Sequence, residues 1–318
     1  TTTATGARIE YRGNVIVLTS ENREPLSADD LFPGGYLGPD RVPYIRADNT
    51  RPIIEEDDDD DAAPPPAPPP PPPEPEPEPT PEPDPHEGRL VRGTPRNDTL
   101  EGGGGNDTIW GGRGDDLIRG IQGDNLIGGG PGNDTIRGGI GNDTLWGGPG
   151  NDLLYGSGGS NVIWGGAGRD TIHGGPGDDM LGGGGGADLI YGGGGDDRIW
   201  GGRGNDTLYG GEGNDTLIAG PGTDWLFGGA GADTFIFYRN DERNRIMDFN
   251  PEEGDILLLS SALWRRLGDL TPEQIVDRFG RVTDSGNILL DFGPGANTTI
   301  TLTDFDDIGI LSEHIHIL

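Results

Sequence analysis

The sequence predicts an all-β protein whose centre is a parallel β-helix, and two regularities in the chain carry this prediction. The first is an acidic position that recurs every nine residues from Asp98 to Asp233 without insertion or deletion, which makes sixteen repeats. The second is an apolar residue two places after each of these positions, from Leu100 to Phe235. Glycines precede the acid, so each unit reads G-G-x-G-x-D-x-U-x, a pattern typical of repeats that stack into a β-helix.

The residue types in each unit indicate a metal site. Glycine adopts φ > 0 or approaches a cation at no steric cost, and calcium takes roughly six to eight oxygens from carboxylates and backbone carbonyls. We therefore expect calcium as the cofactor. Asn125 and Asn161 are expected to be weaker ligands, because an amide supplies an oxygen but no charge. The fourteen candidate aspartate ligands are Asp98, Asp107, Asp116, Asp134, Asp143, Asp152, Asp170, Asp179, Asp188, Asp197, Asp206, Asp215, Asp224 and Asp233.

After each acid we expect a strand of three residues whose middle side chain faces inward and whose neighbours face outward. One inward apolar group is too little for a unit to fold alone, so the units must stack and pair. If two units form one turn of about 18 residues, the repeats form about eight turns with a length on the order of 38 Å.

An 18-residue turn sorts the acids into two columns. The first column, from Asp98 to Asp224, is unbroken, whereas both asparagines fall in the second column, which runs from Asp107 to Asp233. The second column is therefore expected to bind calcium less tightly near its N-terminal end.

The same turn also aligns aromatic residues into two outward rows, one on each sheet. Such rows can stack sugar rings, although neighbouring aromatics on a sheet also stabilise each other by roughly 0.2–1 kcal/mol per pair. The first row holds Trp110, Trp146, Trp164 and Trp200, and the second holds Tyr155, Tyr191, Tyr209 and Phe227.

Residues 93–236 resemble the parallel β-roll of the repeats-in-toxin (RTX) family, also called haemolysin-type calcium-binding repeats. The resemblance implies a secreted bacterial protein with calcium ions between the loops of successive turns. Residues 232–237, 246–249 and 254–260 are similar to the C-terminal cap of the secreted RTX proteases (serralysins). That likeness implies an uncleaved signal for type I export.

The chain divides into four predicted segments. Residues 1–54 form an undefined N-terminal segment, for which the tail of a larger domain is one interpretation. Residues 55–88 form a disordered, acidic and proline-rich linker. Residues 89–236 form the calcium-binding β-roll. Residues 237–318 form a mixed, mostly β C-terminal cap and the secretion region, since a repeat stack needs a cap.

Local signals predict further elements outside the repeats. A hairpin is expected at 7–20, with its turn at residues 13–14. In the cap, strands are expected at 245–249, 255–259, 287–292 and 298–305. A helix is expected after the N-cap residue Thr271, with proline at its first position, glutamine at its third, and its end at Gly280.

Composition excludes several classes of function. The net charge of −33 repels nucleic acid and anionic membrane surfaces. All 22 basic residues are arginine and cysteine is absent, which removes lysine and thiol nucleophiles, disulfides and thiolate metal sites. No stretch approaches the roughly 18 apolar residues of a membrane span. Because the chain starts at Thr1 without a leader, we expect either a fragment or export without an N-terminal signal.

No catalytic residue is predicted. The four histidines, His86, His173, His314 and His316, form no HExxH motif, and the serines Ser157 and Ser160 lack the G-x-S-x-G elbow. His314 and His316 alternate on a strand-like end, where they are interpreted as an exposed pair, with a metal pair as the alternative.

The sequence thus predicts a secreted, extracellular or cell-surface calcium-binding repeat protein that is not an enzyme and folds on binding calcium after export. One alternative is the C-terminal part of a secreted RTX enzyme, a protease, lipase or polysaccharide epimerase, whose catalytic domain is missing. Another is a glycan-binding or biofilm matrix protein. The expected partners are calcium ions, the type I secretion machinery and an extracellular polysaccharide, with no nucleic acid and no membrane span.

Overall fold

The computed structural model describes residues 7–12, 15–20, 44–45, 52–53, 87–265 and 267–318. Near the N-terminus, β1 (Ala7–Arg12) pairs with β2 (Val15–Ser20), and β3 (Tyr44–Ile45) pairs with β4 (Pro52–Ile53), both antiparallel. The strands of the predicted hairpin are therefore confirmed. Its turn, and the linker predicted at 55–88 up to residue 86, lie outside the described residues.

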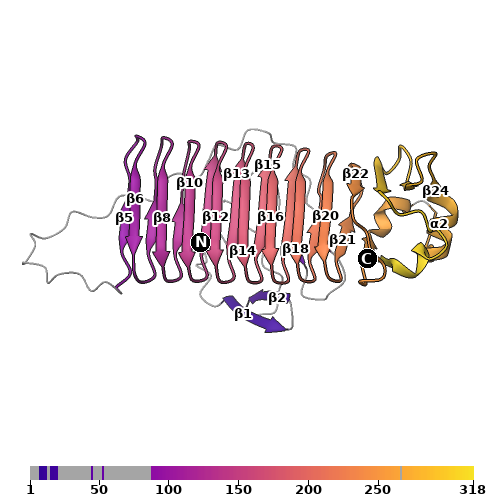
Figure 1. Ribbon diagram of the computed structural model, residues 1–318, viewed down its shortest axis with the longest axis horizontal. Helices are drawn as coiled ribbons and strands as arrows, with labels where there is room; N and C mark the ends of the chain where they lie inside the picture. The colour runs from indigo at the N-terminus through magenta and orange to yellow at the C-terminus, as the bar shows by residue number, and fades with distance from the viewer. Residues whose placement is uncertain (1–6, 13–14, 21–43, 46–51, 54–86, 266) are drawn as a thin grey trace, which may run out of the picture.

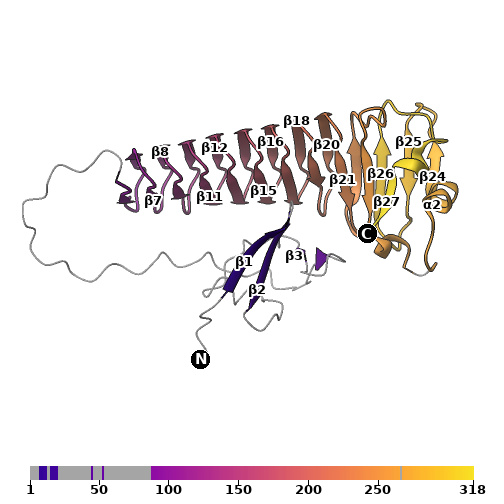
Figure 2. The same ribbon diagram turned by 90° about the horizontal axis from the view of Figure 1, so that it is seen from below.

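From Leu90 onward the chain winds as an elongated solenoid of two sheets, and each turn contributes one strand to each sheet (Figures 1 and 2). Sheet 1 contains β6 (Thr99–Gly103), β8 (Leu117–Gln122), β10 (Thr135–Ile140), β12 (Leu153–Gly158), β14 (Thr171–Pro176), β16 (Leu189–Gly194), β18 (Thr207–Glu212), β20 (Trp225–Ala230), β22 (Glu242–Ile246), β26 (Thr298–Leu302), β25 (Ile288–Asp291) and β24 (Gly280–Val282). Sheet 2 contains β5 (Leu90–Arg92), β7 (Thr108–Trp110), β9 (Leu126–Gly128), β11 (Thr144–Pro149), β13 (Val162–Ala167), β15 (Met180–Gly185), β17 (Arg198–Arg203), β19 (Thr216–Ile218), β21 (Thr234–Phe237), β23 (Ile256–Leu259) and β27 (Ile315–Ile317).

The predicted turn of 18 residues is confirmed by the parallel register, in which Ile136 pairs with Leu154 and Leu145 with Ile163. The solenoid has about nine turns over residues 90–259 rather than eight. The difference arises because β5 precedes the first acid of the repeats, and β22 and β23 follow the last one.

Most repeat strands contain six residues, so the predicted length of three residues is wrong for them. The three-residue length occurs in β7, β9 and β19. In the other strands pairing continues into the glycines after the apolar residue, as between Gly148 and Gly166. The extra pairs bring the loop backbones of successive turns into register.

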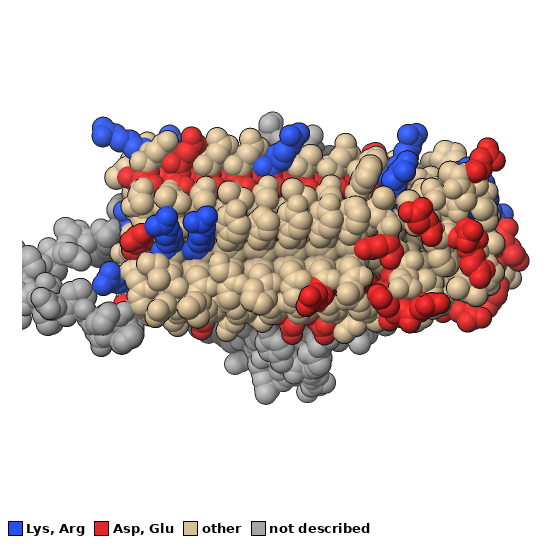
Figure 3. All heavy atoms as spheres, in the orientation of Figure 1, with Lys and Arg blue, Asp and Glu red and all other residues tan. Residues whose placement is uncertain are grey.

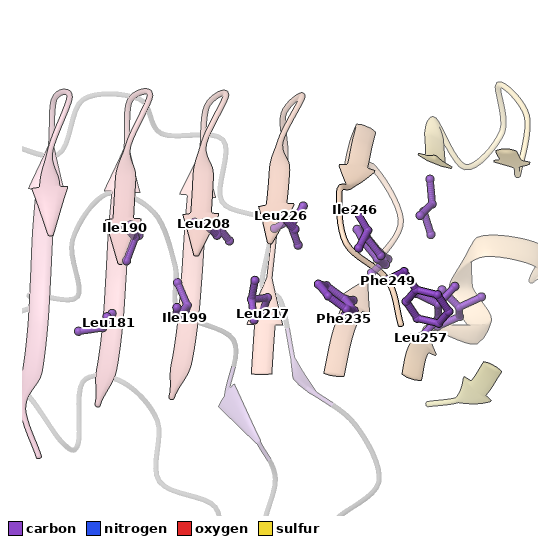
Figure 4. Packing of buried hydrophobic residues seen from close by; sticks show 14 of the residues in the cluster. Leu181, Ile190, Ile199, Leu208, Leu217, Leu226, Phe235, Ile246, Phe249 and Leu257 are labelled. Carbon is purple, nitrogen blue, oxygen red and sulfur yellow. The ribbon is translucent and has the colours of Figure 1, made fainter. Parts of the chain in front are cut away.

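The core is a line of apolar side chains between the two sheets, one from each strand (Figure 4). From Ile109 to Phe235 the inward residue of every repeat is fully buried. Burial of such a side chain contributes roughly 1.5–3 kcal/mol. The inward alternation predicted from the sequence is confirmed, and it fixes which residues face the loops and the outer surface.

The cap extends both sheets rather than ending them. Strand β26 pairs parallel with β22, and β27 pairs parallel with β23, before β24, β25 and β26 close sheet 1 as an antiparallel edge. The predicted helix is confirmed as α2 (Pro272–Phe279), with a complete capping box between Thr271 and Gln274. Short 3₁₀ helices η1 (Ser261–Trp264) and η2 (Leu311–His314) complete the cap.

Two strand boundaries in the cap differ from the prediction. The strand expected at 245–249 lies at Glu242–Ile246, because Asp248 turns back to accept the backbone N–H groups of Gly228 and Gly229 and Phe249 packs on Phe235. The strand expected at 298–305 ends at Leu302. Among the helices in the described part of the chain, none is long and apolar enough to cross a membrane.

Candidate metal site

The acidic residues form two ladders along the loops. One ladder immediately precedes the strands of sheet 1 and the other immediately precedes those of sheet 2. In the first column the backbone N–H of Asp134 donates to Oδ1 of Asp152 at 2.7 Å, and the N–H of Asp152 donates to Oδ1 of Asp170 at 2.8 Å. The second column repeats this bond, for example from Asp179 to Asp197 at 2.8 Å. Each acid therefore fastens its loop to the loop of the previous turn through one carboxylate oxygen.

Both ladders extend one residue beyond the sixteen predicted positions. The N–H of Asp224 donates to Oδ1 of Asn244 at 3.0 Å, and the N–H of Asp233 donates to Oδ1 of Asp255 at 2.9 Å. A nine-residue register misses both, because they follow after 20 and 22 residues. The signal that identifies them is an inward apolar residue two places later, Ile246 or Leu257, as in the repeats.

In eleven of the column aspartates the second carboxylate oxygen is buried and has no hydrogen-bond partner in the described part of the protein. It lies against the glycine five residues earlier, where a Cβ would be 2.3 Å from Oδ2 of Asp152 at Gly147 and 2.2 Å from Oδ2 of Asp197 at Gly192. Glycine stands at this place before every one of these acids except Asp224, which follows Ala219. The residues with such an oxygen are Asp107, Asp116, Asp134, Asp143, Asp152, Asp170, Asp179, Asp197, Asp215, Asp224 and Asp233.

Burial dominates the electrostatics of the columns. Desolvation raises the pKa of Asp152, Asp197 and Asp224 to about 8, although a backbone N–H donated to each carboxylate works in the opposite direction. Neighbouring carboxylates add to the rise, as Asp170 and Asp134 do for Asp152. Without a cation, the buried columns thus disfavour the charged form that a metal ligand requires.

The arrangement fits calcium. A carboxylate that is fixed through Oδ1 and presents a buried Oδ2 without a donor lacks a partner for its charge, and such a group is costly unless a cation compensates it. Hard oxygen ligands from carboxylates and loop carbonyls are those that calcium prefers. Figure 3 shows a line of acidic atoms that runs along the length of the roll, parallel to its axis.

Each residue of a column is one rung of its ladder, and the first rung of each column differs from the rest. Oδ2 of Asp98 accepts the N–H of Thr94 at 2.6 Å and the hydroxyl of Thr94 at 2.9 Å, so its carboxylate already has donors. In the second column Arg89 precedes Asp107, donating its N–H to Oδ1 of that acid at 2.6 Å and its guanidinium to the carbonyl of Gly102 at 3.1 Å.

The structure places the remaining predicted ligands as expected along the columns. Asp188 and Asp206 lie in the first column, buried, with their N–H groups donated to the next acid at 2.8 Å. Asn125 and Asn161 lie in the second column, and the Oδ1 atom of each accepts the N–H of the preceding rung at 2.9 Å.

A second, exposed ladder formed by the residue before each acid was not anticipated. The N–H of Asn151 donates to Oδ1 of Asn133 at 2.8 Å, and the N–H of Arg169 donates to Oδ1 of Asn151 at 2.7 Å. This ladder runs opposite to the buried one, because here the side chain accepts from the following turn. The frequent Asn or Asp at this place in the repeat is the sequence signal for it.

The two aromatic rows occupy the predicted sheets, and within each row rings stack on one another. On sheet 1 Tyr155, His173, Tyr191, Tyr209 and Phe227 form a ladder with ring centroids 4.5–4.9 Å apart. On sheet 2 tryptophans pair across glycine, Trp110 with Trp146 at 6.2 Å and Trp164 with Trp200 at 5.9 Å. The inner faces of the sheet 1 ladder are therefore covered by neighbouring rings.

The histidines that the structure describes form no metal cluster. In the described part of the chain, no three or more side chains of His, Cys, Asp or Glu gather so that they could hold a metal ion by themselves. His314 ends η2 and its Nδ1 lies 3.0 Å from the carbonyl oxygen of Asp255, whereas His316 lies in β27. The alternation of the two on one strand is therefore wrong. His173 belongs to the aromatic ladder, and burial lowers its pKa. His86 lies outside the described residues.

Comparison with protein families gives one match. Residues 92–127, 119–154, 128–163, 146–181, 155–190, 177–208 and 200–235 match the RTX calcium-binding nonapeptide repeat. No curated protein matches the chain.

Among solved structures, a subunit of the Azotobacter vinelandii mannuronan C5-epimerase is 26% identical, with 51% of this chain and 80% of that chain covered and a TM-score of 0.28. The extracellular lipase of Serratia marcescens is 20% identical, with 67% of this chain covered and a TM-score of 0.28. This chain spans 45% of the length of the lipase.

Proposed function

Residues 92–235 of this chain are RTX calcium-binding nonapeptide repeats, and from this premise we propose that the protein is an extracellular calcium-binding module whose roll folds when it binds calcium. The ligands would be the predicted aspartates of the two columns, extended by Asp255. The observation that carries the proposal is the row of buried Oδ2 atoms that accept no hydrogen bond, as at Asp134 and Asp152.

Calcium binding and folding are one event in this proposal. Folding without a cation would bury a row of negatively charged carboxylates or require that they become protonated, as the pKa values near 7 and 8 of Asp134, Asp152 and Asp170 indicate. When calcium is bound it supplies the positive charge that these carboxylates lack. Because the loops that hold the ligands exist only in the stacked roll, the free energy of binding becomes free energy of folding.

Circular dichroism of the full chain tests this proposal. In chelator the β signal of the roll should be absent, and millimolar calcium should restore it, whereas magnesium at the same concentration should not, because magnesium demands a stricter octahedral geometry and gives up its waters reluctantly. A β signal in chelator equal to that in calcium would reject the coupling of folding to calcium.

The same coupling supports extracellular localisation and export by a type I system. Sites of the extracellular type bind calcium at roughly 10⁻⁴–10⁻³ M, so the chain would stay unfolded in the cytosol and fold outside. We propose that residues 237–318 both cap the roll and direct export.

Deletion of Ser312 to Leu318 in a host with a type I exporter should abolish secretion. Because this deletion also removes β27, the purified truncated chain should be checked separately for calcium binding. Undiminished secretion would place the signal elsewhere in the chain.

An acidic or neutral polysaccharide remains a proposed partner, with calcium needed to offset the repulsion between two acidic polymers. The tryptophan pairs of sheet 2 support it, since Trp110, Trp146 and Trp164 remain partly exposed. Replacement of Trp146 and Trp164 by alanine should weaken glycan binding while the calcium-dependent β signal persists. Equal binding by the double variant, or no binding by the parent across a glycan array, would reject this partner.

A further inference from the structure

The amide groups of Asn125 and Asn161 have a fixed orientation in the second column. Oδ1 of Asn125 accepts the backbone N–H of Asp107, and Oδ1 of Asn161 accepts the N–H of Asp143, each at 2.9 Å. A buried N–H must meet an acceptor. The amide oxygen is therefore committed to the ladder, and Nδ2 takes the place that Oδ2 has in an aspartate.

That Nδ2 group points into the loop. A Cβ on the glycine five residues earlier would lie 2.5 Å from Nδ2 at both asparagines, close to the 2.2–2.4 Å found for Oδ2 in neighbouring aspartate loops such as those of Asp143 and Asp152. The Nδ2 of Asn125 donates to the carbonyls of Gly123 at 2.9 Å and Gln122 at 3.4 Å, and to Oδ1 of Asp143 at 2.9 Å.

The Nδ2 of Asn161 makes the corresponding bond to the carbonyl of Gly159 at 3.3 Å. An amide NH₂ is a donor only and has no lone pair to offer a metal. It also bonds to loop carbonyls of the kind that would otherwise be available as ligands.

The glycines of the same two loops also depart from the repeat pattern. This observation does not depend on how the amides are oriented. The residue four places before the acid is a glycine with positive φ in the aspartate loops of both columns from Asp107 onward, as at Gly139 and Gly175. In the two asparagine loops it is Ile121, with φ 88°, and Ser157, with φ 84°.

The loop before Asp98 follows the same rule, because Thr94 stands at this place and its N–H and O–H groups occupy Oδ2. Loss of the glycine thus coincides, in all three loops, with hydrogen-bond donors at the place where loops such as those of Asp143 and Asp152 present a bare oxygen.

We propose that the loops ending at Asn125 and Asn161 bind no calcium and that the side-chain amide replaces the ion in each. This inference rests on the proposed calcium function of the aspartate loops. It replaces the expectation of weak ligands with two metal-free rungs that alternate with Asp107, Asp143 and Asp179. These rungs separate the carboxylates of the second column, so its first turns need fewer ions to assemble than the matching turns of the first column.

The number of calcium ions bound by the full chain at saturation tests the proposal. Native mass spectrometry, checked by equilibrium dialysis, would compare the parent with Ser157→Gly/Asn161→Asp and Ile121→Gly/Asn125→Asp, which restore the common repeat. Each repaired chain should bind one more ion than the parent. The matched reverse variant, Asp197→Asn, converts a regular rung of the same column into an asparagine rung and should bind one ion fewer with an unchanged β signal in calcium.

The outcomes separate this inference from the function on which it rests. Repaired chains that bind the same number of ions as the parent would overturn it, since the loops would then already hold calcium. It would also be overturned by Asp197→Asn chains that fold and keep the full number of ions, because an amide rung would then be compatible with an ion. A parent chain that binds no calcium would instead reject the proposed function.

Discussion

At the scale of single residues, the glycine five places before nearly every acid makes room for its carboxylate. At Gly147 a Cβ would lie 2.3 Å from Oδ2 of Asp152 and 2.5 Å from the carbonyl oxygen of Gly165. Both contacts are with groups that the ladder or the fold holds in place. The requirement for glycine therefore comes from crowding within the candidate ligand shell, and not only from backbone freedom.

We predict that Gly147→Ala lowers calcium affinity and the melting temperature in calcium, because the loop must shift away from Asp152. Calcium titration followed by circular dichroism measures both. Gly158→Ala is the control, since its Cβ would meet nothing closer than 3.7 Å and its effect should be small. Equal effects of the two substitutions would contradict the crowding argument.

One loop carries alanine naturally at this place. Ala219, five residues before Asp224, is fully buried, and the N–H of Gly202 reaches its carbonyl at 3.2 Å, compared with 2.9 Å between Gly130 and Gly147. The longer bond is consistent with local adjustment around the extra methyl group. We therefore expect Gly147→Ala to weaken a single rung and leave the roll folded in calcium.

A second prediction at this scale concerns pH. Burial raises the folded-state pKa of Asp134, Asp170 and Asp179 to about 7 and of Asp152 and Asp197 to about 8, above the ordinary value of 3.8. The calcium-free folded roll therefore holds more protons than the unfolded chain between these values, and its stability falls as pH rises from about 4 to about 8.

The metal-free protein should accordingly gain β signal on acidification through this window. In the presence of calcium the direction reverses, because protons compete for the same oxygens, so the calcium midpoint should rise as pH falls. Both trends are measured by circular dichroism of dialysed protein at a series of pH values. A calcium midpoint independent of pH would show that these carboxylates do not take part.

At the scale of elements, the outer surface of sheet 1 is held by the aromatic ladder. Tyr191 stacks between His173 at 4.7 Å and Tyr209 at 4.9 Å, whereas Tyr155 has one ring neighbour and the guanidinium of Arg137 5.1 Å from its ring centroid. Stacked aromatic pairs contribute about 0.5–1.5 kcal/mol each beyond burial. A ring in the middle of the ladder therefore supports three strands.

We predict that Tyr191→Ala costs about 1–3 kcal/mol from the loss of two stacked pairs. Tyr155→Ala, measured in an Arg137→Ala background so that the cation–π contact is already absent, should cost about half as much, because it then removes one stacked pair. Urea unfolding at saturating calcium measures the difference. Equal losses would mean that the rings contribute through burial alone.

At the scale of the whole molecule, the cap supplies the final turn with a continuation that the repeats cannot provide. Asn244 and Asp255 extend the ladders, and Asp248 accepts two loop N–H groups that have no further turn above them. Phe249 packs on Phe235, the last inward residue of the repeats. These contacts satisfy the loops and cover the core at one end of the roll.

We predict that a chain ending at residue 238 associates through the exposed edges of β20 and β21, since unpaired edges template further strands. Light scattering after size exclusion in calcium measures the association. Phe249→Ala is the control: it keeps the cap strands and should remain monomeric while losing about 3–5 kcal/mol to the cavity. A truncated chain that stays monomeric would contradict the role of the cap.

The periodic part of the molecule was predictable from the sequence because each of its determinants is local. The inward residues from Ile109 to Phe235, the two columns of acids, the two aromatic rows and the capped helix after Thr271 all follow from spacing and residue type. Fixed spacing converts directly into geometry when every turn has the same length. The same reasoning stopped at Asp233, because the insertions before Asn244 and Asp255 break the spacing while the pairing continues.

Only the tertiary structure decided what each side-chain atom does within the columns. Spacing places Asp152, Asn161 and Asp98 in equivalent positions, yet Oδ2 of Asp152 is bare, the amide of Asn161 donates into its loop, and Oδ2 of Asp98 accepts from Thr94. Two contacts together produce these differences. An N–H of the adjacent turn, 18 residues away in most rungs, binds Oδ1 and so fixes which side-chain atom faces the loop. The loop itself then decides whether that second atom has a partner, as Thr94 does for Asp98 and Gly159 for Asn161.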